Sequence, residues 1–149
     1  MHTDFSSNLD KEFAQVSALW SARVIAMANG QYGKIAKIAK VKGEFVWHSH
    51  ANEDEFFLVR KGTLVIRYRH RADAVLAEGD FHVLPRGVEH QTAAPEECWV
   101  VLVEPATTRH TGETVTDLTT SIEQQLAHLR PANQQTSEQE TPARWPSRS

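Results

Sequence analysis

The stretch FVWHSHANEDEFFLV, residues 45 to 59, places two histidines two positions apart and follows them with three acidic residues. Side chains two apart on an extended strand project from the same face, so His48 and His50 can bind one ion together. The same spacing also suits two histidines on a solvated strand face, because a metal site needs further ligands. The remaining ligands have to come from elsewhere in the chain.

The alternation of the next strand separates the three acidic residues. If Lys61-Gly62 forms a two-residue hairpin turn, the inner-face pairs across it are Glu55 with Tyr68, Phe57 with Ile66 and Val59 with Leu64. Glu55 is then the one carboxylate on an apolar face, where it needs a cation or hydrogen bonds. Glu53 and Asp54 are better explained as solvated turn residues.

A third histidine follows two turn signals in GDFHVLPRGVEH, residues 79 to 90. The sequence Pro85-Arg86-Gly87 restricts the backbone just before His90. His48, His50, Glu55 and His90 together offer three imidazoles and one carboxylate, which leave two positions open on a six-coordinate metal. Open positions are where a metal performs chemistry.

The pocket around such a site has three further candidates. Phe57 and Tyr68 share the predicted inner face with Glu55, and Gln91 follows His90 directly. Tyr68 either contacts the Glu55 carboxylate or a substrate, or is an ordinary core aromatic. We expect these three side chains to line a pocket for a small molecule.

Two other reactive residues fit structural roles better. His82 alternates with Phe81 and Val83 and is expected to face solvent. Cys98 begins the run CWVVLVEP, which is typical of a strand buried on both sides and predicts a structural thiol.

Length and periodicity predict one domain in four parts. The chain has 149 residues. We expect an N-terminal helical segment over residues 1–20 with a cap at Asp10, then a β-barrel over 21–112. Asn29-Gly30 predicts a two-residue hairpin turn near the start of the barrel, and many short strands follow. A C-terminal helix is expected over 113–130 and a disordered tail over 131–149.

The composition excludes several classes of partner. The net charge is -3, with 16 basic and 19 acidic residues, which disfavours nucleic acid and anionic membranes. The chain lacks an apolar run of the roughly 18 residues that a membrane helix needs, and no secretory signal is recognisable. With a single cysteine, any metal site must use nitrogen and oxygen ligands. We therefore expect a cytoplasmic protein that takes a small-molecule ligand.

These residues resemble the two signature motifs of the cupin superfamily. The first motif is matched by Gly43, His48, His50, Glu55 and Gly62, and the second by Gly79, Pro85, Gly87 and His90. Only four residues rather than five separate Gly43 from His48, and Ala94 stands where an asparagine often ends the second motif. Neither departure removes a ligand. The chain looks most like small single-domain bacterial cupins.

The resemblance implies an all-β, cupin-type jelly-roll β-barrel with a short N-terminal helix and a C-terminal helix. It implies one divalent ion, Mn, Fe, Ni, Co or Zn, held inside the barrel by His48, His50, Glu55 and His90. It also favours a homodimer, in which the N-terminal helix and first hairpin would cover exposed sheet edges.

Three functional classes remain open at the level of sequence. The favoured one is a metal-dependent enzyme that acts on an oxygen-bearing small molecule, as a dioxygenase, a decarboxylase or an isomerase. The alternative is a non-catalytic, metal-loaded binding or sensing module. A metal-free sugar epimerase is disfavoured because all four ligands are present.

Overall fold

The computed structural model describes residues 6–29 and 33–108. The predicted C-terminal helix over 113–130 and tail over 131–149 lie outside the described residues, as does the end of the predicted barrel. No helix within the described ranges is long and apolar enough to cross a membrane.

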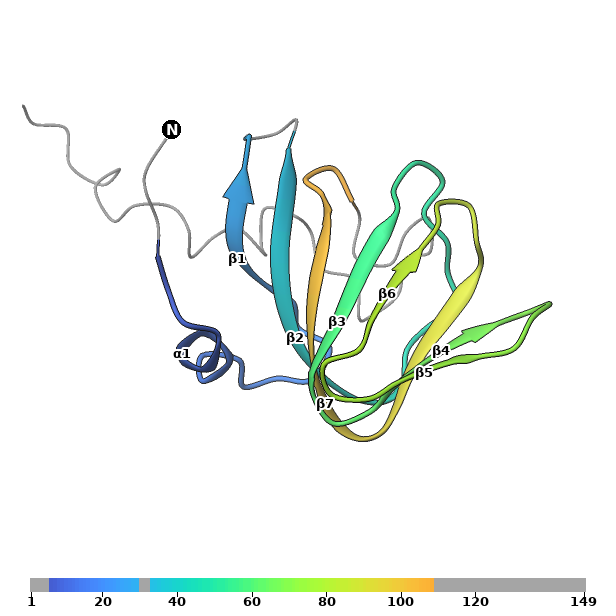
Figure 1. The fold of residues 1–149 in the computed structure, drawn as a ribbon, viewed down its shortest axis with the longest axis horizontal. Helices are drawn as coiled ribbons and strands as arrows, with labels where there is room; N and C mark the ends of the chain where they lie inside the picture. Colours follow the sequence, from blue (N-terminus) through green and yellow to red (C-terminus); the bar gives the residue numbers. More distant parts are fainter. Residues whose placement is uncertain (1–5, 30–32, 109–149) are drawn as a thin grey trace, which may run out of the picture.

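The described part is an antiparallel β fold with one short helix (Figure 1). The elements are α1 (Leu9–Phe13), β1 (Arg23–Ala28), β2 (Lys34–Glu44), β3 (Glu55–Lys61), β4 (Leu64–Tyr68), β5 (Ala74–Leu76), β6 (Phe81–Leu84) and β7 (His90–Pro105). The main path of the sheet runs β1-β2-β7-β3-β6, and β4 pairs with β5 and β7. This is the all-β architecture that the sequence predicts.

The long strand β7 joins the two halves of the sheet. Its first residues, 90–93, pair with β4, and its later residues, 98–105, pair with β2. Strand β3 pairs with the same later part of β7 on the opposite side. The β2–β7 register shifts at Gly43, whose φ of +80° is a conformation that side chains rarely adopt. The curved sheet therefore wraps around one interior.

Strand β2 is buried on both faces, which gives the protein two cores. The inner core lies inside the curve of the sheet and includes Val41, Phe57, Leu64, Ile66, Leu84 and Val100. The outer core lies under α1 and is formed by Phe13, Val16, Ile38 and Val101. We call these the inner core and the outer core. Both take alternate residues from β2 and β7, as the period of a strand requires.

The N-terminal segment is less helical than its apolar spacing indicates. The helix covers only Leu9–Phe13, and its N-cap is Asn8 rather than Asp10. The Asn8 side chain accepts hydrogen bonds from two backbone N–H groups of the first turn. Trp20 lies beyond the helix in a loop with a φ of +61°.

Two hairpin predictions are wrong in detail. The β1–β2 ladder ends with Ala28 opposite Lys34, which does not fit a two-residue turn at Asn29-Gly30, although Gly30 itself lies outside the described residues. Strands β3 and β4 do not pair with each other, because the chain at Gly62 crosses from one part of the barrel to another. The inner-face set nevertheless stands: Glu55, Phe57, Val59, Leu64, Ile66 and Tyr68 are all buried.

Candidate metal centre

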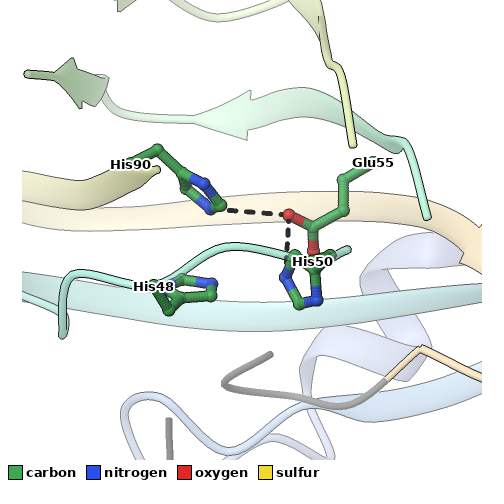
Figure 2. A group of neighbouring side chains, drawn as sticks. All are labelled: His48, His50, Glu55 and His90. Atoms are coloured by element: carbon green, nitrogen blue, oxygen red, sulfur yellow. Dashed lines mark ion pairs between the residues drawn. The ribbon is translucent and has the colours of Figure 1, made fainter. Parts of the chain in front are cut away.

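Four buried side chains converge inside the barrel, as Figure 2 shows. They are His48, His50, Glu55 and His90, and one potential ligand atom from each lies within 4.8 Å of the others. None of the four is more than 5% exposed. The structure thus brings together the four predicted ligands, and the cluster could hold a metal ion.

Backbone hydrogen bonds bring the first and last ligands together. The HxH segment is not a regular strand, but His48 forms an isolated bridge with His90. The His48 N–H donates to the His90 carbonyl at 3.0 Å, and the His90 N–H donates back at 2.9 Å. The spatial proximity of two ligands 42 positions apart is therefore fixed by main-chain geometry.

The proline-glycine turn before His90 is bonded to the segment that carries the other ligands. The Gly87 N–H donates to the His50 carbonyl at 2.7 Å. The Arg86 N–H donates to the Asp54 carboxylate, also at 2.7 Å. Asp54 is exposed and Glu55 buried, as the alternation predicted. Asp54 therefore serves the loop geometry rather than the cluster itself.

Two of the imidazoles are oriented by backbone carbonyls. Nδ1 of His48 lies 2.9 Å from the Val46 carbonyl oxygen, and Nδ1 of His90 lies 3.0 Å from that of Val88. A carbonyl can only accept, so each Nδ1 carries the proton and each Nε2 keeps a free lone pair. This arrangement fixes the tautomer that a metal-binding histidine needs.

Several polar atoms of the cluster lack hydrogen-bond partners among the described residues. They are both ring nitrogens of His50, Oε2 of Glu55 and Nε2 of His90. The nearest approaches to Glu55 Oε2 are 3.3 Å from His50 Nε2 and 3.6 Å from His90 Nε2. Buried polar atoms without partners are costly, and a bound cation would take one ligand atom from each of the three residues, including one ring nitrogen of His50. The donor set therefore fits a divalent ion.

The charges of the metal-free cluster follow from burial and from one ion pair. Burial lowers the pKa of His48 to about 4 and also lowers the pKa of His90. Burial alone would raise the pKa of Glu55, but the close ion pair with His50 holds it at about 2. Burial opposes protonation of His50, yet Glu55 outweighs it and raises the His50 pKa. His50 is therefore the imidazole that must lose a proton when an ion binds.

A cavity of about 60 Å³ opens beside His48, Glu55 and His90. A water needs roughly 10–15 Å³ in this measure, so the cavity admits only a small molecule. Phe57 lines it, as predicted, together with the apolar side chains of Trp20, Ala39, Val41, Phe45, Leu64, Val100 and Leu102.

The other two predicted pocket residues do not line this cavity. The Tyr68 hydroxyl is 2.6 Å from Nε2 of His82, and the side chain belongs to the inner core. The Gln91 amide donates to the Phe45 carbonyl and accepts from Arg67. Both side chains already have partners elsewhere, so neither Tyr68 nor Gln91 contacts the cavity.

The predicted orientation of His82 is wrong. Phe81 and Val83 are 65% and 53% exposed, whereas His82 between them is half-buried against Tyr68. The side chains of β6 do alternate, but the inward-facing set is His82 and Leu84 rather than Phe81 and Val83. Cys98 is fully buried, and burial raises its pKa to about 11, which is consistent with a structural thiol.

Three lining residues were missed by sequence reasoning. Lys37 on β2 and Glu104 on β7 form an ion pair inside the barrel, and Trp20 reaches the cavity from its loop. A detectable signal for Lys37 is its place in the alternating series Ile35, Lys37, Ala39 and Val41, which is otherwise apolar.

Comparison with known proteins identifies the family. Residues 36–104 match the family model described as a cupin domain. A solved cupin-2 domain containing protein from Shewanella frigidimarina NCIMB 400 is 43% identical, has a TM-score of 0.62 and is matched over 66% of this chain and 93% of its own. A solved protein from Neisseria meningitidis is 23% identical, with a TM-score of 0.61, and is matched over 68% of this chain and 99% of its own.

The match to a curated relative covers a shorter segment of the chain. The uncharacterized protein YdbB of Bacillus subtilis (strain 168) is 38% identical over 56 residues, which are 38% of this chain and 50% of YdbB. The chain thus spans half the length of that relative. The antiparallel fold, the two matched motifs and the similarity to the Shewanella protein agree, and the chain belongs to the cupin family.

Proposed function

We propose that this cupin binds one divalent metal ion through His48, His50, Glu55 and His90 and uses it to transform a small oxygen-bearing molecule. The observation that carries the proposal is the set of buried nitrogen and oxygen atoms that point at one another without hydrogen-bond partners among the described residues. Three imidazoles and one carboxylate suit Mn, Fe, Ni, Co or Zn. Decarboxylation, isomerisation and dioxygenation are the reaction types that such a site supports.

The chain's own residues prepare the site in three ways. His48 and His90 are held neutral by burial, with their Nε2 lone pairs free. Glu55 is held ionised by His50, so one negative charge is ready to offset a cation. Phe57, Leu102 and Trp20 surround the adjoining cavity and exclude bulk water. A divalent ion, when bound, supplies Lewis-acid or redox chemistry at the positions that the four ligands leave open.

The first experiment is elemental analysis of protein purified without added metal. We expect one divalent ion per chain in the wild type and none in His48→Ala or His90→Ala. His82→Ala is the matched control, because it removes a half-buried histidine outside the cluster. Unchanged metal content in the two ligand variants contradicts the assignment.

The second experiment separates catalysis from binding. Oxygen uptake and product formation are measured with the metal-loaded protein and a panel of small hydroxy, oxo and carboxylate compounds. Turnover that disappears in His90→Ala supports the enzyme. Metal-dependent binding without turnover across the panel favours the alternative of a sensing or binding module.

We also propose a cytoplasmic homodimer. Strand β1 ends the sheet path, and Met27 on it is 42% exposed, so this edge is available for a second copy. The helix α1 was expected to cover a sheet edge of the second copy. Instead, its residue Phe13 is fully buried against the sheet of its own chain. Light scattering coupled to size-exclusion chromatography gives the mass, and a monomer mass rejects the dimer.

A further inference from the structure

The barrel interior holds a second charged group that the four-residue cluster does not include. Lys37 and Glu104 are each only 2% exposed and form an ion pair on the inner face of β2 and β7. Lysine is almost never fully buried unless it is paired. Both side chains line the same cavity as His48, Glu55 and His90.

The ion pair is continuous with the candidate metal centre. Phe56 of β3 pairs with Val103 of β7, so the next residues along, Glu55 and Glu104, fall opposite each other. Both are buried, and both side chains line the same cavity. On the neighbouring strand β2, Lys37 lies opposite Leu102 and pairs diagonally with Glu104, so the charged side chains continue from the cluster to Lys37.

Stability does not explain this pair. Burying two charges costs more desolvation energy than apolar residues of similar volume, so such pairs are weak evidence for a role in stability. The neighbouring positions Ile35 and Ile38 on β2 are fully buried and apolar, which shows that this strand accommodates hydrophobic side chains on both faces. A ligand that uses the charges is the better explanation.

The chemistry of Lys37 indicates what the ligand carries. An ammonium group has three N–H donors, and Glu104 is the one partner that the structure gives Nζ among the described residues. With a divalent ion in the cluster, the ion and the ammonium outweigh Glu55 and Glu104 by one positive charge. Such a cavity attracts an anion.

Resting on the metal site proposed above, we propose that Lys37 is the specificity-determining residue of this cavity and that the cavity takes a small organic monocarboxylate. The carboxylate accepts hydrogen bonds from Nζ of Lys37, while a hydroxyl or oxo oxygen on the adjacent carbon faces the four-residue cluster. The apolar walls contact the carbon atoms, and the volume of about 60 Å³ limits the ligand to a few heavy atoms.

The test uses glycolate and ethylene glycol, which have the same number of carbon atoms. Only glycolate carries a carboxylate. Calorimetric titration of the metal-loaded full chain gives both affinities. We expect Lys37→Met to weaken glycolate binding tenfold or more, to leave ethylene glycol unchanged and to keep full metal content. Lys37→Arg should recover part of the glycolate affinity because it restores the charge.

Glu104→Gln gives an effect of the opposite sign. Removing the competing carboxylate frees the ammonium, so glycolate should bind more tightly than to the wild type. If the ion pair had only a structural role, Lys37→Met and Glu104→Gln would both bind glycolate more weakly than the wild type. Lys40→Met is the matched control, since Lys40 lies on the same strand but above the Trp99 ring on the other face.

Each outcome decides the proposal. If Lys37→Met does not fold, the double variant Lys37→Met/Glu104→Gln is compared with Glu104→Gln alone, and its weaker glycolate binding supports the inference. Two results overturn the inference and leave the metal site standing, provided that the wild type is fully loaded with metal. In the first, Lys37→Met does not change the glycolate affinity; in the second, the wild type does not bind glycolate. A wild type that holds no metal overturns the proposed function and this inference with it.

Discussion

The inner and outer cores are built from the same two strands and differ in chemistry. On β2, Lys37 faces the cavity and its neighbour Ile38 faces α1; both are buried. The outer core is entirely apolar, whereas the inner core is interrupted by two carboxylates, one ammonium and three imidazoles. Apolar burial stabilises a fold, while buried charge costs free energy. The contrast indicates that the outer core supports stability and the inner core supports binding.

The largest expected effect on metal binding is on the inner side. Adding the native divalent ion at 100 times its dissociation constant should stabilise the wild type by about 2.7 kcal/mol, because only the folded chain assembles the four ligands. His90→Ala should lose this stabilisation almost completely. Thermal unfolding with and without a chelator measures it, and an equal metal-dependent shift in both proteins would contradict the site.

A substitution in the outer core should lower stability and leave metal binding unchanged. Ile38→Ala removes a fully buried side chain under α1 and should lower the free energy of unfolding by about 2–5 kcal/mol. Its metal content should stay at the wild-type value, since the side chain points away from the cluster. Urea unfolding and elemental analysis on the same sample provide the check. If Ile38→Ala kept its stability but lost its metal, the assignment of stability to the outer core and binding to the inner core would be wrong.

A smaller effect is expected from pH on metal binding. The pKa of His50 is raised by Glu55, so below that pKa His50 carries a proton that an ion must displace. His48 and His90 have lowered pKa values and contribute no proton at neutral pH. The apparent affinity should therefore rise with pH, by about tenfold per unit, until it levels off above the His50 pKa. Calorimetry in two buffers of different ionisation enthalpy should report about one released proton per ion.

The smallest effect is expected at the hydrogen bond between Tyr68 and His82. Tyr68→Phe removes a 2.6 Å contact that lies away from the cavity, and should cost about 1 kcal/mol of stability. Metal content and glycolate binding should not change. A loss of metal in this variant would restore the idea that Tyr68 supports Glu55.

Much of the candidate site could be predicted because it follows from the period of a strand. Glu55 was separated from Glu53 and Asp54 by alternation combined with an assumed β3–β4 hairpin, and the inference survived even though β3 and β4 do not pair. Burial on one face depends on the period of two and not on which neighbour supplies the hydrogen bonds. The four ligands are also close in two short motifs, so little long-range information was needed.

The residues that were missed depend on long-range packing. Lys37 is visible in the sequence only as one lysine in an apolar series, and its partner Glu104 comes from β7, far along the chain. Trp20 reaches the cavity through a loop with positive φ, where its indole N–H donates to the Lys42 carbonyl. The phase of β6 was misread because its two outward residues, Phe81 and Val83, are apolar. Local pattern does not reveal which apolar side chains a barrel leaves exposed.

The bridge between His48 and His90 has a consequence for how such a site can change over evolution. Two main-chain hydrogen bonds hold these positions together, and neither bond involves an imidazole. Replacing either histidine with another residue that tolerates an extended backbone would leave the frame in place. The donor atoms at these positions can therefore be exchanged, or lost, one at a time without dismantling the barrel. The same scaffold is open to new ions and new reactions through side-chain substitution alone.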